Sequence, residues 1–296
     1  MKIDRFDVAV SGGSLAAYRF ADSGGRKPAV LAAHGTTASS YSWLALARAL
    51  AGRAAIVAPD LRGRGASNEL PGPYGLASHV ADLVACLDQL EVEQPAVVVG
   101  HSLGAYIVAA LAAEHPHRVR HAILVDGGLR IPGSEDVDPQ TFLDAFLGPA
   151  LARLKLTFES REAYRDWWRS HPALAGSDVA DADLAGYADH DLVGEAPRLH
   201  SCVAEAAVRG DAAELGQHAA AAAYRLTIPS TLMCAPRGLV NDPNPTQPLE
   251  QVEAWASAAP AQRRAIQVPG CNHYTIVLGR AGASAVAEVV QSALAL

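Results

Sequence analysis

The pattern G-H-S-L-G at residues 100–104 constrains the fold of this chain most, because of the segments on either side. The apolar, β-branched run at residues 96–99 is typical of a buried parallel strand, and the run at residues 105–113 is typical of a helix. A serine at such a strand-to-helix turn stands on strained backbone with its hydroxyl exposed. The flanking glycines are needed where a side chain would collide with neighbouring backbone. In this context the pattern predicts that Ser102 is a nucleophile.

The rest of the chain alternates strands and helices. Eight strand-like runs are predicted at residues 5–10, 15–20, 29–33, 54–58, 96–99, 122–125, 230–234 and 265–268. Helical patterns fall at residues 42–50, 76–90, 103–114, 248–258 and 281–295. This alternation predicts an α/β fold with a mostly parallel sheet and helices on both faces. The 296 residues, 50% of them hydrophobic, suffice for one large domain with an insertion, or at most two domains.

The alternation breaks between residues 130 and 225. No strand is predicted there, and helical pieces fall at residues 141–146, 161–169 and 202–208. We interpret this segment as a helical cap inserted after the sixth strand, which leaves residues 1–129 and 226–296 as the core domain. Much of the chain's limited aromatic content lies in it. Most of these aromatic side chains are expected to fill the cap's own core, and one or two to line a pocket.

A serine hydroxyl is a poor nucleophile until a base removes its proton, so Ser102 requires a histidine. His273 is the strongest candidate of the eleven histidines, because its loop follows the last predicted strand. The carboxyl ends of parallel strands open on one edge of the sheet, and Ser102 lies on that edge. The alternative for His273 is an ordinary polar residue of a surface loop.

The imidazole in turn needs a carboxylate that fixes its tautomer and stabilises its protonated form. Asp126 directly follows the predicted strand at residues 122–125, and Asp242 lies further into the loop after residues 230–234. Asp126 is favoured because a strand end gives rigid placement. Each has a structural alternative, since Asp126 can cap the next segment and Asp242 can be a turn residue before Pro243.

An oxyanion formed at the substrate carbonyl needs two fixed hydrogen-bond donors. The N–H of Leu103 is expected to be one, because it begins a helix whose dipole favours negative charge. The N–H of Thr36, after the third strand, is expected to be the second, with Thr37 as a substitute. The substrate-pocket candidates combine cap aromatics with neighbours of the catalytic candidates: His101, Phe142, Phe146, Trp167, Trp168 and Tyr274.

These residues resemble the α/β-hydrolase superfamily over essentially the whole chain. The matching elements, in the expected order, are H-G at residues 34–35, P-D-L-R-G-R-G-A-S at residues 59–67, the pattern at residues 100–104, and N-H at residues 272–273. The resemblance implies an eight-stranded sheet whose second strand is antiparallel, and a cap between the sixth and seventh strands. It also implies Ser102 as nucleophile, His273 as base, and the amides of Leu103 and Thr36 as the oxyanion hole.

The acid departs from the superfamily's commoner pattern. Many relatives carry it a few residues after the seventh strand, where this chain has Gly238. A minority use a carboxylate after the sixth strand, which corresponds to Asp126. The resemblance therefore favours Asp126 and leaves Asp242 open.

Composition and charge limit the classes of binding partner that we expect. A formal net charge of −7 without clustered basic residues argues against nucleic acid or an anionic membrane as a partner. The four cysteines are scattered, and neither a signal peptide nor a membrane span is apparent, so a cytoplasmic protein is expected. No spaced metal cluster stands out among the histidines. We expect neither a metal nor another cofactor.

A serine rather than an aspartate at the turn argues against dehalogenase and epoxide hydrolase chemistry, and favours acyl transfer. The leading hypothesis is a serine hydrolase for a small, fairly apolar carboxylic ester or lactone. The alternatives are a thioesterase or a C–C bond hydrolase with the same triad, and a non-catalytic ligand receptor on the hydrolase scaffold. Oligomeric state and the substrate's acyl and alcohol parts are left open by the sequence.

Overall fold

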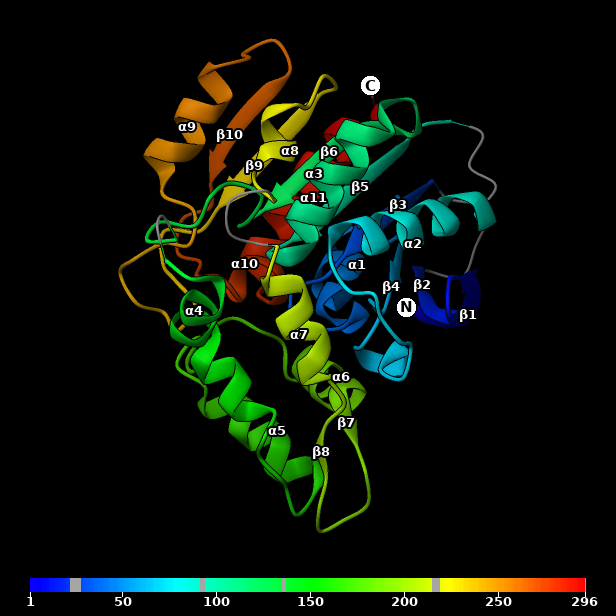
Figure 1. Cartoon of the computed structure of the whole chain (residues 1–296), viewed down its shortest axis with the longest axis vertical. Helices are drawn as coiled ribbons and strands as arrows, with labels where there is room; N and C mark the ends of the chain where they lie inside the picture. The colour runs from blue at the N-terminus through cyan, green and yellow to red at the C-terminus, as the bar shows by residue number, and fades with distance from the viewer. Residues whose placement is uncertain (22–27, 91–93, 135–136, 215–218, 296) are drawn as a thin grey trace.

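Eight strands form one sheet in the order β1-β2-β4-β3-β5-β6-β9-β10 (Figure 1). The computed structural model describes residues 1–21, 28–90, 94–134, 137–214 and 219–295. Its main strands are β1 (Lys2–Val10), β2 (Gly13–Ala21), β3 (Ala29–Ala33), β4 (Ala55–Pro59), β5 (Ala96–His101), β6 (Val119–Val125), β9 (Ser230–Cys234) and β10 (Arg263–Gln267). All eight strand predictions are confirmed, with shifts of a few residues at their ends.

The sheet is mixed at one edge and parallel elsewhere. Strand β2 pairs antiparallel with both β1 and β4. The pairs β3–β4, β3–β5, β5–β6, β6–β9 and β9–β10 are all parallel. This confirms the expected α/β-hydrolase topology, in which the second strand runs opposite to the others. The carboxyl ends of β5, β6, β9 and β10 consequently share one edge, where ligand sites form in α/β sheets.

Helices cover both faces of this sheet. They are α1 (Leu44–Ala49), α2 (Leu76–Gln89), α3 (Leu103–Glu114), α8 (Ala221–Tyr224), α9 (Leu249–Ser257), α10 (Thr275–Leu278) and α11 (Arg280–Ala295), with 3-10 turns at Ser40–Trp43, Gly65–Ser67 and Pro116–Arg118. Successive side chains of a strand point to opposite faces. Thus Val97 and Val99 join the apolar cluster under α1 and α11, while Val98 joins the cluster under α2 and α3. Each face therefore has its own core.

Most of the segment predicted as a cap lies together at one end of the molecule, whereas α8, at the end of that segment, lies beside α3 (Figure 1). It contains α4 (Pro139–Arg153), α5 (Arg161–Ser170), α6 (Asp181–Asp191) and α7 (Glu205–Ala212). The prediction that it holds no strand is wrong, because β7 (Leu192–Val193) and β8 (His200–Ser201) form a small hairpin. Two-residue strands carry too little periodicity to be seen in the sequence. Helix α6 was also missed, and the proposed domain division stays a prediction.

The aromatic side chains of this segment extend the core of the sheet. Phe158, Tyr164, Trp168 and Tyr187 belong to the same apolar cluster as residues on the α1 and α11 face. Burial of such side chains is the main stabilising contribution to this contact. Among the described residues, no helix is long and apolar enough to cross a membrane.

Candidate active site

Ser102 occupies a strained turn between β5 and α3. Its backbone angles are φ 53° and ψ −119°, a left-handed φ that residues other than glycine rarely adopt. A Cβ atom on Gly100 would lie 2.0 Å from the carbonyl oxygen of Gly104, and one on Gly104 would lie 2.0 Å from the carbonyl oxygen of Ala33. Both glycines of the pattern are therefore required by close backbone contact. The turn holds the serine side chain at the edge of the sheet, partly exposed.

His273 and Asp126 meet at the same edge. His273 Nδ1 donates a hydrogen bond of 2.6 Å to Asp126 Oδ2, and both side chains are buried. The other carboxylate oxygen, Oδ1, accepts a hydrogen bond of 3.0 Å from the N–H of Ala235 at the end of β9. With Nδ1 protonated, the neutral imidazole leaves Nε2 unprotonated and able to accept a proton.

The backbone around this pair is also fixed. Asp126 has a φ of 47°, and its N–H donates a hydrogen bond of 2.7 Å to the carbonyl of Met233. In the histidine loop, Asn272 Oδ1 accepts hydrogen bonds from the N–H groups of Tyr274 and Thr275, and Asn272 Nδ2 donates one of 2.7 Å to the carbonyl of Ala173. The preceding asparagine thus connects the histidine loop to the segment predicted as a cap.

Asp242 lies elsewhere. Its Oδ1 accepts a hydrogen bond of 3.0 Å from the N–H of Asn244, which is the turn arrangement foreseen as its structural alternative. Gly238, where the commoner acid would stand, has no space for a side chain, because a Cβ atom would lie 2.4 Å from the carbonyl oxygen of Asn244. The geometry therefore pairs Asp126, and not Asp242, with His273.

Ser102 and His273 line one small cavity of about 30 Å³. We call residues 34–37, which follow β3, the oxyanion loop. Its residues Gly35, Thr36 and Thr37 also line this cavity. A Cβ atom added to Gly35 would lie 3.3 Å from the Cβ of Ser102. This volume is of the order of one water molecule. The reacting carbonyl of a substrate would therefore be held close to both Ser102 and the oxyanion loop.

His34 sets the direction of the Gly35–Thr36 peptide. Burial lowers the pKa of His34 to about 4, so the ring is neutral near pH 7. Its Nδ1 donates to the carbonyl of Gly35 at 2.8 Å, and its Nε2 accepts from the N–H of Leu61 at 3.0 Å. In a trans peptide the N–H points away from the carbonyl. The N–H of Thr36 therefore points away from His34.

Neither predicted oxyanion donor is already engaged. None of the backbone hydrogen bonds among the described residues uses the N–H of Thr36 or of Leu103. Leu103 is the first residue of α3, and the first N–H groups of a helix lack partners within it. Both amides are thus free to bind an oxyanion.

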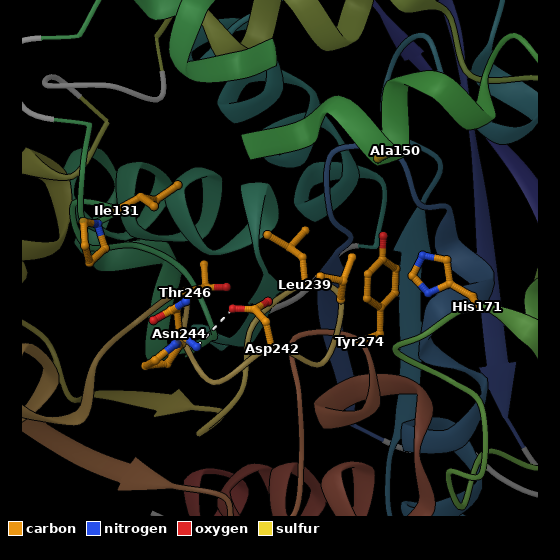
Figure 2. Close-up of a pocket in the computed structure, with 11 residues that line it drawn as sticks. Ile131, Ala150, His171, Leu239, Asp242, Asn244, Thr246 and Tyr274 are labelled. Atoms are coloured by element: carbon orange, nitrogen blue, oxygen red, sulfur yellow. Dashed lines mark hydrogen bonds between the residues drawn. The ribbon is translucent and has the colours of Figure 1, made fainter. Parts of the chain in front are cut away.

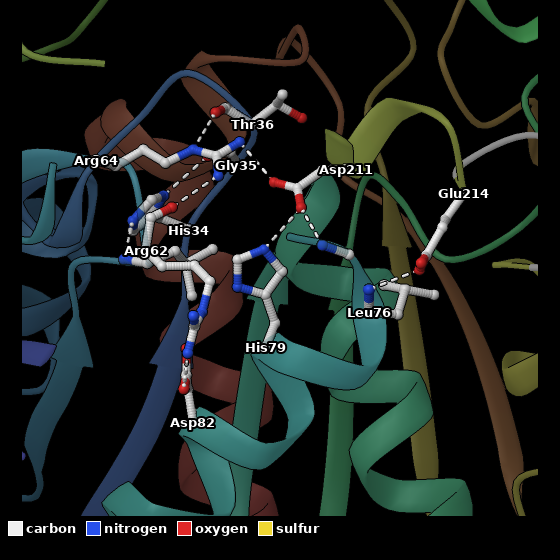
Figure 3. A network of polar contacts seen from close by, with 12 residues as sticks. His34, Gly35, Thr36, Arg62, Arg64, Leu76, His79, Asp82, Asp211 and Glu214 are labelled. Carbon is white, nitrogen blue, oxygen red and sulfur yellow. Dashed lines mark hydrogen bonds and ion pairs between the residues drawn. The ribbon is translucent and has the colours of Figure 1, made fainter. Parts of the chain in front are cut away.

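Two buried arginines bind the carbonyl groups of the oxyanion loop, a role that no sequence pattern predicted. Arg64 Nε donates a hydrogen bond of 2.9 Å to the carbonyl of Thr36, and Arg64 Nη2 lies 2.7 Å from Asp211 Oδ2 of α7 (Figure 3). Arg153 of α4 donates one of 2.9 Å to the carbonyl of Thr37 and is paired with Asp191. The oxyanion loop is therefore fastened to helices of the segment predicted as a cap.

The Arg64 network continues into the sheet domain. Asp211 Oδ1 also accepts hydrogen bonds from His79 Nε2 at 2.9 Å and from the N–H of Gly75 at 2.7 Å (Figure 3). Burial by itself would raise the pKa of Asp211. The charge of Arg64 and the hydrogen bonds from His79 and Gly75 outweigh this effect, so the pKa is lowered. This carboxylate consequently stays ionised and joins α7 to the start of α2.

His101, a pocket candidate, supports the histidine loop. Its Nε2 donates a hydrogen bond of 2.8 Å to the carbonyl of His273, and the two rings lie 4.7 Å apart. Burial, with a contribution from His273, lowers the pKa of His101 well below its usual value. The ring is therefore neutral, and it lines the small cavity together with Tyr274.

The remaining candidates for the substrate pocket lie in different parts of the segment predicted as a cap. Trp168 is buried against Tyr164 and Tyr187, and Trp167 packs beside it. Neither tryptophan lines the small cavity or the larger one beside it. Phe142 and Phe146 lie in α4 at positions whose side chains are outside the described residues.

A larger cavity, of about 330 Å³, is drawn in Figure 2 and shares part of its wall with the small one. Leu239 and Tyr274 line both cavities, and α4 contributes Leu147 to the small one and Ala150 to the large one. Asp242 lies in the wall of the large cavity. Within the described part of the chain, no group of three or more His, Cys, Asp or Glu side chains is arranged to hold a metal ion.

Comparison with known proteins places this geometry in a family. The family model described as alpha/beta hydrolase fold matches residues 28–279. Among solved structures, E-2-(acetamidomethylene)succinate hydrolase is similar over 100% of both chains, with a TM-score of 0.79 and 19% identity. At this identity the likeness shows a shared fold.

Curated relatives match over shorter stretches. Lipase LipV of Mycobacterium tuberculosis is 38% identical over 127 residues, which are 42% of this chain and 48% of the lipase. An uncharacterized protein of Mycobacterium bovis is 36% identical over 112 residues, which are 38% of this chain and 32% of that protein. The chain thus matches less than half the length of each of these relatives.

Proposed function

The chain belongs to the alpha/beta hydrolase fold family, and we propose that it hydrolyses a small, fairly apolar carboxylic ester or lactone through an acyl-enzyme on Ser102. The observation that carries this proposal is the hydrogen bond between His273 and Asp126 at the sheet edge where Ser102 stands. A buried carboxylate that holds a neutral imidazole beside a strained serine is the arrangement that acyl transfer needs. The named activity of the matched lipase agrees with it.

In the proposed first step, His273 Nε2 takes the proton of the Ser102 hydroxyl as its Oγ attacks the carbonyl carbon. The N–H groups of Leu103 and Thr36 bind the resulting oxyanion. The carbon–oxygen bond to the leaving group then breaks, and the alcohol departs with the proton from His273.

The second step returns the enzyme to its starting state. A water molecule gives a proton to His273 and attacks the acyl carbon, the bond to Ser102 Oγ breaks, and the serine recovers its proton. Asp126 stays ionised throughout and stabilises the protonated imidazole. Reactants and products balance as one ester plus one water giving one acid and one alcohol. We propose that residues 130–225 act as a cap that shields the acyl-enzyme from bulk water.

Turnover of chromogenic esters and lactones by wild type and by Ser102→Ala tests this proposal. We expect wild type to hydrolyse members of the panel and the variant to lose all but a small residual rate. Full activity in Ser102→Ala would overturn the proposal. Rates on matched oxygen esters, acyl-CoA thioesters and C–C bond substrates would separate the proposal from its alternatives, which use the same serine on another leaving group.

A further inference from the structure

The large cavity between α4 and the loop after β9 has a polar wall that the proposed reaction does not use. Asp242 and Thr246 lie on this wall, while Ile131 and Leu239 give it an apolar part (Figure 2). The hydroxyl of Thr246 is buried, with 5% of the residue exposed, and has no hydrogen-bond partner among the described residues. A buried hydroxyl without a partner is costly, so a group that enters the cavity and bonds to it would be stabilised.

The backbone of this wall is held in place. Gln247 donates a hydrogen bond of 3.0 Å from Nε2 to the carbonyl of Thr246, and its Oε1 accepts one of 3.2 Å from the N–H of Leu129. The carboxylate of Asp242 is oriented by the N–H of Asn244. The Asp242 carboxylate and the backbone that carries Thr246 are therefore in position before any ligand binds, which lowers the entropic cost of binding.

The charged side chains that line the cavity have one sign. Among the described residues that line it, Asp242 carries a carboxylate, and there is no lysine or arginine. Of the two arginines in neighbouring segments, Arg153 is paired with the carboxylate of Asp191, and Arg237 donates hydrogen bonds to the neutral Asn241 and does not line the cavity. The Asp242 carboxylate is half-buried, and its Oδ2 accepts no hydrogen bond from the described part of the chain, so it can accept one from a ligand.

His171 completes the polar lining. Burial, and then the charge of Arg153, lower the pKa of His171, so its ring is neutral near pH 7. Its Nδ1 accepts a hydrogen bond of 3.2 Å from the N–H of Ala173, which leaves the proton on Nε2. This ring consequently adds no positive charge that would offset Asp242.

We propose that this cavity binds the part of the substrate remote from the scissile bond, and that this part carries a hydroxyl or ammonium group that donates a hydrogen bond to Asp242. This inference rests on the proposed ester hydrolysis at Ser102, because the two cavities share Leu239 and Tyr274. A carboxylate or phosphate at the same place would be repelled by Asp242. The substrate is therefore a hydroxy- or amino-substituted ester or lactone rather than a dicarboxylic or CoA-linked one.

The test uses two sets of esters. In the first set, phenyl esters of one acyl chain length end in an ammonium, hydroxyl, methyl or carboxylate group. In the second set, the same four groups end the alcohol half of the ester. We expect kcat/KM of wild type to be at least about tenfold higher for the hydroxyl and ammonium esters than for the carboxylate ester in one set. Equal values for all four groups in both sets would overturn the inference.

Variants assign the preference to the wall. In Asp242→Asn, the ratio of kcat/KM for the hydroxyl ester to that for the carboxylate ester should fall at least about tenfold, because the repelling charge is removed. Asp166→Asn removes an exposed carboxylate of α5 and should leave the ratio as in wild type. An unchanged ratio in Asp242→Asn would overturn the inference. If this variant does not fold, Val240→Lys, at an exposed position of the same wall, should move the ratio in the same direction.

A binding measurement separates the inference from the proposed reaction. Calorimetric titration of Ser102→Ala with the corresponding amides measures the preference without turnover, and the hydroxyl and ammonium amides should bind at least about tenfold more tightly than the carboxylate amide. Equal ester turnover in wild type and Ser102→Ala would contradict the proposed function. The expected order of amide binding would not change, because it does not depend on turnover. Ser102-dependent turnover with no binding order would contradict the cavity inference alone.

Discussion

His273 Nδ1 and Asp126 Oδ2 lie 2.6 Å apart, although 147 positions separate the two residues in the chain. Asp126 directly follows β6 and His273 follows β10, and the parallel sheet brings both loops to the edge that carries Ser102. The carboxylate is also fixed from its other oxygen by the N–H of Ala235. This double anchorage makes Asp126 a rigid partner for the imidazole.

Replacement of Asp126 by asparagine keeps the shape of the side chain and removes its charge. The imidazole of His273 then loses the partner that fixes its tautomer, and kcat should fall by about 10³- to 10⁴-fold. Asp242→Asn, which removes the other candidate acid, should lower kcat far less. Steady-state kinetics on one activated ester measure both. A larger loss in Asp242→Asn than in Asp126→Asn would contradict the assignment.

Gly100→Ala should destabilise the fold by about 3 kcal/mol or more, because the new Cβ would stand 2.0 Å from a backbone oxygen. Gly148→Ala is the matched control, since Gly148 lies in α4 with open space at its Cβ position. There, alanine should stabilise the helix by up to about 1 kcal/mol. Urea unfolding measures both free energies. Equal stability of the two variants would argue against close backbone contact at the turn between β5 and α3.

Arg153→Met removes the guanidinium that is buried between Asp191 and Tyr164 and bonded to the carbonyl of Thr37. The buried carboxylate of Asp191 keeps its hydrogen bonds from Tyr164 and Ser201 but loses its cation, so the free energy of unfolding should fall by about 3–5 kcal/mol. Arg169→Met breaks an exposed pair on α5 and should change the free energy of unfolding far less. Chemical denaturation compares the two, and equal losses would show that the Arg153 pair contributes no more than a surface pair.

Stability should also fall as the pH is lowered, because His34 is buried in its neutral form. Its pKa is about 4 in the folded chain and about 6.5 when unfolded, so below about pH 6.5 the unfolded state binds the extra proton. From about pH 7.5 to about pH 5, this histidine alone should lower the free energy of unfolding by about 2 kcal/mol.

Unfolding free energies of wild type and His34→Gln at the two pH values check this dependence. The loss between them should be about 2 kcal/mol smaller in the variant, whatever its stability at neutral pH. His117→Gln, at an exposed position, should show the wild-type loss. A loss in His34→Gln as large as that in wild type would contradict the neutral, buried state of His34.

The sheet was predictable because its signals are local. Residues 96–104 combine β-branched side chains with a glycine-flanked serine, and each later strand is an apolar run with turn residues at its ends. Asp126 was also foreseen, since it directly follows a strand whose direction the alternation indicates. The left-handed φ of Asp126 and the missing space at Gly238 needed coordinates, because both depend on segments distant in sequence.

The contacts of the segment predicted as a cap were not foreseen. Arg153 meets Asp191, 38 positions further along the chain, and Arg64 meets Asp211, and neither spacing has a periodic signal. Trp167 and Trp168 were pocket candidates because of their residue type, yet side-chain packing places Trp168 in the apolar cluster. Sequence patterns indicate which residues are apolar, and they leave open which face of a cap helix turns toward the substrate.

Rapid-quench kinetics combined with mass spectrometry detect the acyl-enzyme on Ser102 itself. With an activated ester in excess, we expect a burst of released alcohol equal to the enzyme concentration, and an acyl group on the peptide that contains Ser102. Ser102→Ala should show neither the burst nor the adduct. Wild-type turnover by Ser102→Ala, or an acyl group on another residue, would rule out Ser102 as the nucleophile.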